Sequence, residues 1–144
     1  MSLWDTTGQE KYRAMNNLFI KCSRCVILGY DITDKLSFKE IENYHYNNVK
    51  NILGDEPLIY LVANKIDLID KEEVSEEEAI EYAKEKGIKY YRVSAKTGEG
   101  VNELFEDIVN SLIIKFKKVI NDNDTNLIEK ITKDGTEIKR LNIK

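Results

Sequence analysis

The sequence has few of the residues from which metal and redox sites are commonly built. Its 144 residues include one histidine, His45, and two cysteines, Cys22 and Cys25. Cys-Ser-Arg-Cys has the spacing of a redox motif or of half a zinc site, but zinc requires two more ligands and no second cysteine pair is present. A redox pair needs its nucleophile at a helix start, whereas Cys25 leads into Val-Ile-Leu, which is typical of a strand. We therefore predict two reduced, partly buried thiols.

Neither an excess of basic residues nor a long apolar run is present. Lysine and arginine number 22 against 26 aspartates and glutamates, and the net charge is -4. Binding to nucleic acid through a basic face needs the opposite balance, so we expect no nucleic-acid partner. No apolar run approaches the ~18 to 20 residues that span a bilayer, and the amino terminus lacks signal-peptide features. We expect one hydrophobic core and a cytoplasmic protein.

The most informative stretch is an apolar run over residues 57–68, which ends on Asn-Lys-Ile-Asp at positions 64–67. It predicts a buried parallel strand, and ligands of open α/β sheets bind beyond the carboxyl ends of strands. The carboxylate of Asp67 offers only acceptors, whereas guanine presents two adjacent donors, its N1–H and its 2-amino group. We therefore predict that Asp67 reads guanine, that Asn64 bridges neighbouring loops and that the stem of Lys65 lies along the base or sugar. The alternative is a strand that ends in an ordinary polar turn.

A second polar stretch, Asp-Thr-Thr-Gly-Gln-Glu at positions 5–10, follows a short predicted strand at Leu3-Trp4. An aspartate at a strand end can hold Mg²⁺, usually through water, so Asp5 is a candidate metal ligand. A glycine lets a backbone N–H approach a terminal phosphate, and a glutamine can orient an attacking water, which makes Gly8 and Gln9 candidates for those roles. Here too the alternative is an ordinary polar loop.

Further strands and helices alternate along the chain. Strands are predicted over residues 25–33 and 88–93, and helices over residues 11–21, 37–53, 75–87 and 101–120. This alternation predicts an α/β fold with a mainly parallel sheet and right-handed crossovers. Ser-Ala-Lys at positions 94–96 closes the strand over residues 88–93, and its backbone N–H groups can donate to a base carbonyl such as guanine O6.

The composition turns polar after about residue 120, so we predict one domain over residues 1–120 and a tail over residues 121–144. Asp-Gly at positions 134–135 favours a type I′ hairpin over residues 127–143. A disordered tail is about equally expected, because an isolated two-stranded ribbon is only marginally stable in water.

Together these motifs resemble those of the small GTPases of the Ras superfamily, and within it the Rab branch. Residues 4–10 resemble the Trp-Asp-Thr-Ala-Gly-Gln-Glu stretch that opens switch II, residues 64–67 match the guanine-specificity motif, and residues 94–96 match the loop that contacts guanine O6. The resemblance covers about residues 3–120. It implies a P-loop-NTPase-like fold of three layers and a switch that binds and hydrolyses GTP in vesicle traffic.

The resemblance also implies roles for single residues. Asp5 would serve Mg²⁺, Gly8 the γ-phosphate and Gln9 the hydrolytic water of a GTPase reaction. Trp4 and Phe19 fall on two members of the aromatic group through which Rab proteins meet effectors. The implied base contacts are Asn64, Lys65, Asp67, Ser94, Ala95 and Lys96. The implied cofactors and partners are GTP or GDP with Mg²⁺, Rab effectors, an exchange factor and a GTPase-activating protein, with recruitment to endomembranes in a full-length form.

One family motif is absent from the printed residues. Family members begin with a strand, the phosphate loop Gly-x-x-x-x-Gly-Lys-Ser/Thr, a helix, switch I and a second strand, and no such sequence precedes or replaces residues 4–10. We therefore expect a partial small-GTPase domain that lacks its first two strands and whose phosphate and Mg²⁺ sites are incomplete.

The cost of that absence is large. Losing about four charge-assisted hydrogen bonds, at roughly 1.5 to 3 kcal/mol each, removes about 6 to 12 kcal/mol. We therefore expect this chain to hold GTP and GDP poorly and to hydrolyse GTP slowly. The alternative function is a nucleotide-independent interaction module, or an inactive fragment, that keeps the effector-facing surface. With no cysteine beyond Cys25, prenylation would provide no lipid anchor in this chain.

Overall fold

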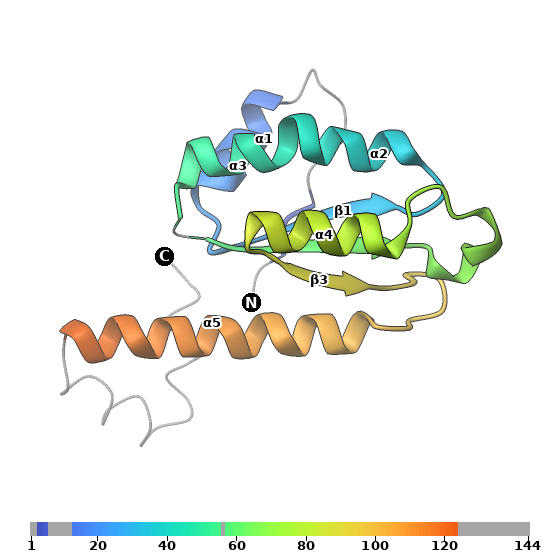
Figure 1. The fold of residues 1–144 in the computed structure, drawn as a ribbon. Helices are drawn as coiled ribbons and strands as arrows, with labels where there is room; N and C mark the ends of the chain where they lie inside the picture. The colour runs from blue at the N-terminus through green and yellow to red at the C-terminus, as the bar shows by residue number, and fades with distance from the viewer. Residues whose placement is uncertain (1–2, 6–12, 56, 124–144) are drawn as a thin grey trace.

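A parallel sheet of three strands forms the centre of the protein. The computed structural model describes residues 3–5, 13–55 and 57–123. The strands are β1 (Cys25–Asp31), β2 (Leu58–Asn64) and β3 (Lys89–Arg92), and they lie in the order β1-β2-β3. Both pairs are parallel, so the three arrows of Figure 1 point the same way and the strands end at one edge of the sheet. This confirms the predicted α/β class and is consistent with an incomplete P-loop GTPase fold.

Helices cover both faces of the sheet and complete the predicted three layers. One face is covered by α2, α3 and α4, and α5 lies along the other (Figure 1). The helical elements are α1 (Arg13–Lys21), α2 (Lys35–Glu40), η2 (Ile41–His45), α3 (Tyr46–Leu53), η3 (Ile66–Lys71), α4 (Glu76–Lys86) and α5 (Val101–Asn123).

The central strand β2 supplies side chains to both cores. Ile59, Leu61 and Ala63 lie in the larger core beneath α2, α3 and α4. Tyr60 and Val62 point the opposite way and pack with residues of α5. Successive side chains of a strand point to opposite faces, so a strand buried on both faces needs a continuous apolar run. That is the run recognised in the sequence.

The helix that follows β1 begins earlier than predicted. Asp34 caps it, because its Oδ1 accepts hydrogen bonds from the N–H groups of Leu36 at 2.9 Å and Ser37 at 3.4 Å. The start predicted at residue 37 is therefore wrong, since the helix begins at Lys35. Aspartate and serine cap about equally well, and here the hydroxyl of Ser37 instead accepts from the N–H of Asp31 at 3.0 Å. A π-helical turn, η2, separates α2 from α3.

The limits predicted for α4 are confirmed. Ser75 Oγ accepts from the N–H of Glu78 at 3.2 Å, and Gly87 closes the helix in the left-handed conformation, with φ of 64°. The carboxylate of Glu78 does not complete a capping box but accepts from the ammonium of Lys35 at 3.0 Å.

The predictions for the strand at the amino-terminal end, for the two thiols and for the hairpin have different outcomes. The strand predicted at Leu3-Trp4 is wrong, since residues 3–5 are not in a strand. Both thiols are free, but only Cys25 is partly buried, and burial raises its pKa to about 11; Cys22 is exposed. The predicted hairpin over residues 127–143 lies outside the described residues, as do Gly8 and Gln9.

Candidate functional site

Asn64 connects the loops that follow β2 and β3. Its Oδ1 accepts hydrogen bonds from the N–H of Lys65 at 2.7 Å and from the N–H of Ala95 at 3.1 Å. Ala95 lies 31 residues further along the chain, so this one side chain holds two distant segments together. This is the bridge between loops expected of Asn64. Because the N–H of Ala95 is engaged in this contact, donating to guanine O6 would require it to share or exchange this bond.

Lys65 makes the turn that redirects the chain out of β2. Its φ of 67° and ψ of 33° place it in the left-handed region, and it is the one non-glycine residue with positive φ in the described part of the chain. That conformation costs a residue with a side chain about 1 to 2 kcal/mol, so the surroundings must stabilise it. The ammonium of Lys65 forms an ion pair with Asp31 at the end of β1, a contact not predicted from the sequence.

Asp67 is held in an ionised form that offers acceptors. Ser94 Oγ donates to Asp67 Oδ1 at 2.6 Å, and Lys96 Nζ lies 3.8 Å from Asp67 Oδ2. The hydrogen bond from Ser94, opposed by partial burial and assisted by Lys96, holds the pKa of Asp67 below its ordinary value. The side chain of Asp67 keeps 15% of its surface exposed, so the carboxylate remains open to a ligand.

Ser94 is fully buried and is itself fixed by the loop that follows β3. Its Oγ accepts from the N–H of Thr97 at 3.1 Å, while its own N–H donates to the carbonyl oxygen of Glu99 at 2.9 Å. The hydroxyl therefore has one remaining direction for its proton, toward Asp67. Gly100 completes the loop with φ of 71°, directly against the backbone of Arg92.

The structure thus brings together all six candidate residues for base binding at the carboxyl edge of β2 and β3. Two side chains of this edge were not predicted as part of a site, Asp31 and Thr33. The signal for Asp31 was available in the sequence, because it ends a buried strand on a polar residue as Asn64 does.

The metal candidate, Asp5, does not join this cluster in the described part of the chain. Asp5 is exposed, and no hydrogen bond or ion pair described for residues 3–5, 13–55 and 57–123 connects it to Asn64 or Asp67. The same described residues contain no group of three or more side chains that could hold a metal ion. The assignment of Mg²⁺ to Asp5 stays a prediction.

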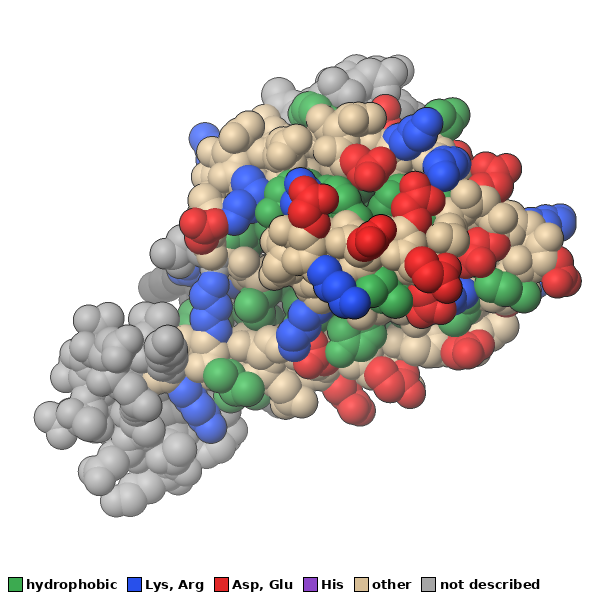
Figure 2. All heavy atoms as spheres, viewed as in Figure 1, with side chains coloured by type: hydrophobic (Ala, Val, Ile, Leu, Met, Phe, Trp, Pro, Cys, Tyr) green, Lys and Arg blue, Asp and Glu red, His purple; other side chains and the backbone are tan. Residues whose placement is uncertain are grey.

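The surface over α4 and η3 is rich in acidic side chains, as Figure 2 shows. The first turn of α4 alone contributes Glu76, Glu77 and Glu78.

Trp4 and Phe19, the two predicted effector residues, are in contact. Their rings stack with centroids 4.9 Å apart and planes inclined by 23°. Trp4 is 65% exposed, and Leu3 and Leu18 beside them in the sequence are similarly exposed. The arrangement leaves an apolar surface open at one end of α1.

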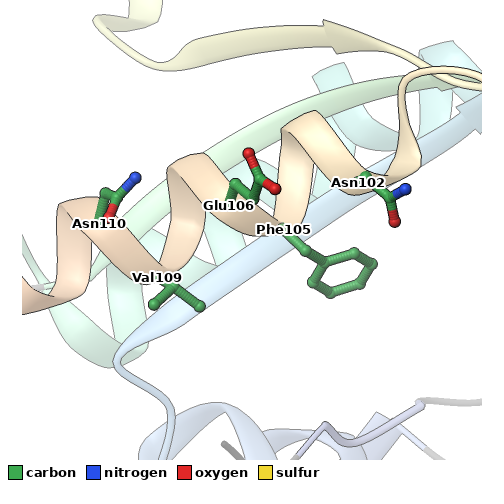
Figure 3. A pocket seen from close by; sticks show the side chains of 5 residues that line it. All are labelled: Asn102, Phe105, Glu106, Val109 and Asn110. Carbon is green, nitrogen blue, oxygen red and sulfur yellow. The ribbon is translucent and has the colours of Figure 1, made fainter.

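A separate hollow lies along α5, lined by Asn102, Phe105, Glu106, Val109 and Asn110. Figure 3 shows Phe105 and Val109 extending from one side of the helix and Glu106 and Asn110 from the other. It contains none of the candidate residues. In the described part of the chain, no helix is long and apolar enough to cross a membrane.

Comparison with known families matches residues 1–114 to the Ras family. The chain belongs to the Ras family, and its relatives are of the Rab type.

Ras-related protein Rab-21 of Geodia cydonium is 42% identical over 113 residues, which are 78% of this chain and 49% of that protein. The human Rab-21 is 40% identical over 113 residues, covering 78% and 50% of the two chains. GTP-binding protein YPT52 of Saccharomyces cerevisiae is 37% identical over 131 residues, covering 76% and 56%. The chain therefore spans about half the length of these relatives.

Proposed function

We propose that this chain is the base-reading part of a Rab-like switch protein that binds guanine nucleotides in vesicle traffic. The observation that carries the proposal is the carboxylate of Asp67, ionised, partly exposed and aimed by the buried hydroxyl of Ser94 at 2.6 Å. The relatives include proteins named Ras-related and GTP-binding, which supports the same reading.

In this proposal Asp67 accepts hydrogen bonds from N1–H and the 2-amino group of guanine. Adenine carries no donor at N1 and no 2-amino group, so it leaves the carboxylate unpaired, which is the source of selectivity. Asn64 fixes the distance between the two loops, and Lys65 and Lys96 flank the base. In the same proposal the γ-phosphate would be bound by Gly8, the hydrolytic water oriented by Gln9 and Mg²⁺ held by Asp5. The proposal also includes association with endomembranes, effectors, exchange factors and GTPase-activating proteins.

The test compares several nucleotides rather than measuring a single affinity, because we expect the 144-residue chain to bind each nucleotide weakly. Amide signals of the 144-residue chain are followed by NMR during titration with GDP, XDP (the xanthine analogue) and ADP. GDP should shift the signals of residues 64–67 and 94–96 at lower concentration than ADP.

The decisive variant is Asp67→Asn, which replaces one acceptor oxygen by a donor and so matches xanthine. We expect it to lose at least about tenfold in the GDP-to-XDP preference, the value of one charge-assisted hydrogen bond. The matched control is Asp70→Asn, which makes the same charge change at an exposed position of η3. Equal responses to GDP and ADP, or an unchanged preference in Asp67→Asn, would contradict the proposal.

The stacked pair of Trp4 and Phe19 favours a second candidate, an interaction module that acts without nucleotide. Trp4 is the only tryptophan in the sequence, so its fluorescence reports on this surface alone. A switch should change that fluorescence when GDP is added, whereas a nucleotide-independent module should not.

A further inference from the structure

Asp31, at the end of β1, is held by three contacts. Its Oδ1 accepts from the N–H of Thr33 at 2.8 Å and from the hydroxyl of Thr33 at 2.7 Å. Its Oδ2 forms the ion pair with the ammonium of Lys65. The strand register places Asp31 directly beside Asn64, so it lies at the edge where the candidate base contacts gather. Its side chain is only 20% exposed.

These contacts determine where the side chain of Lys65 lies. Its backbone stands between Asn64 and Asp67 on the segment that leaves β2, but its ammonium is bound to β1. Its methylene groups must therefore cross from β2 toward β1. Asp67 instead pairs with Lys96, on the β3 side. Asp31 therefore pairs with Lys65 and Asp67 with Lys96, and these two ion pairs flank the cluster.

The arrangement also keeps Lys65 away from Asp67. The pKa of Lys65 is raised first by its hydrogen bond to Asp31, and Asp67 contributes a smaller effect of the same sign. Asp67, two residues further along the chain, attracts the ammonium more weakly than Asp31 does. If Asp31 were removed, the ammonium of Lys65 would compete with a base for the carboxylate of Asp67.

We propose that Asp31 is a positioning residue of the guanine site: by holding the ammonium of Lys65 at β1, it fixes the methylene groups of Lys65 as one wall of the site and leaves Asp67 free to accept from the base. This inference rests on the proposed function, in which Asp67 reads guanine. Asp31 itself touches no base in this arrangement, because both its oxygens are occupied.

The test is a double-mutant cycle on the full 144-residue chain. Its variants are Asp31→Asn, Lys65→Met and the combination, each titrated with GDP by NMR. Asn retains an oxygen for the contacts with Thr33, and Met keeps an apolar stem that needs no ionic partner. Asp31→Asn should weaken GDP binding by about two- to fivefold, the range of a partly exposed ion pair. Contacts between the Lys65 methylene protons and the guanine and ribose protons should disappear.

In the Lys65→Met background, the same change at Asp31 should have no further effect, because no ammonium remains to be held. A merely structural role of Asp31 would weaken binding equally in both backgrounds and would overturn the inference. Asp55→Asn is the matched control, since it removes the carboxylate of another lysine pair, with Lys50, outside the site. It should leave GDP binding unchanged.

The two proposals fail in different ways. If the wild-type chain does not prefer GDP to ADP, the proposed function fails and the inference about Asp31 fails with it. If that preference is present but Asp31→Asn binds GDP as the wild type does, only the inference about Asp31 is overturned.

Discussion

Gly100 occupies a position that leaves no room for a side chain. Its φ is 71°, and a Cβ built there would lie 2.2 Å from the carbonyl oxygen of Arg92, which belongs to the backbone of β3 and cannot move aside alone. This close approach lets the loop that carries Ser94 close against the end of β3. The glycine is therefore part of what aims Ser94 at Asp67.

Gly100→Ala should destabilise the protein by about 3 kcal/mol, because it combines left-handed strain with a backbone clash. Gly98→Ala is the matched control, since Gly98 has φ of 85° but nothing lies within 4 Å of its Cβ position. It should cost only about 1 kcal/mol from backbone strain. Urea unfolding of both variants measures the difference. Equal losses would show that the clash is relieved elsewhere.

A polar network fastens α5 to the sheet. The hydroxyl of Tyr60, in β2, donates to Asp107 Oδ2 at 2.8 Å, and Lys89, in β3, donates to the same oxygen at 2.7 Å. Lys89 also donates to Ser111 Oγ at 3.0 Å. The pKa of Asp107 is lowered first by Lys89, so the folded protein favours its charged form.

This network predicts a pH dependence of stability. A lowered pKa in the folded state stabilises the protein above the unfolded pKa of about 3.9 and loses that contribution as pH falls through the folded value. At pH 7, Asp107→Asn should therefore be less stable than the wild type, by up to about 1 kcal/mol because Lys89 is half exposed. The difference should shrink below about pH 4.

Thermal unfolding of both proteins between pH 7 and pH 3 measures this difference. Glu106→Gln, at an exposed position next to Asp107, is the matched charge change and should show no such trend. If the difference in stability between the wild type and Asp107→Asn stays constant with pH, the charge of Asp107 contributes nothing to stability.

In the three-stranded sheet as a whole, the strands differ in how they are paired. β2 is hydrogen-bonded on both sides, whereas β1 pairs with β2 alone among the described strands. An edge strand with a free row of backbone groups opens more easily and can accept another strand.

Hydrogen exchange should therefore separate the strands. The amides of β2 that bond to its neighbours should exchange most slowly, at the rate of global unfolding, while the outward-facing amides of β1 should exchange much faster. Measurements at several protein concentrations serve as the control, because protection of β1 that grows with concentration would reveal pairing between chains. Protection of β1 equal to that of β2 at low concentration would contradict the free edge.

The sequence by itself determined the class of fold and the position of the candidate site. The apolar run of β2 has the pattern of a strand buried on both faces, and the capping signals at Ser75 and Gly87 act within one turn of chain. Motifs at strand ends predicted that the six candidate base-binding residues lie together, because parallel strands bring their carboxyl ends to one edge.

Only the tertiary structure decided how those residues are paired. In the structure Asp34 caps α2, while the hydroxyl of Ser37 accepts from the N–H of Asp31. The pairing of Lys65 with Asp31 rather than Asp67 depended on the register between β1 and β2. The contact between Lys65 and Asp31 joins residues that are far apart in the sequence, and nothing in the local sequence ranks one carboxylate above another until the strands have placed them.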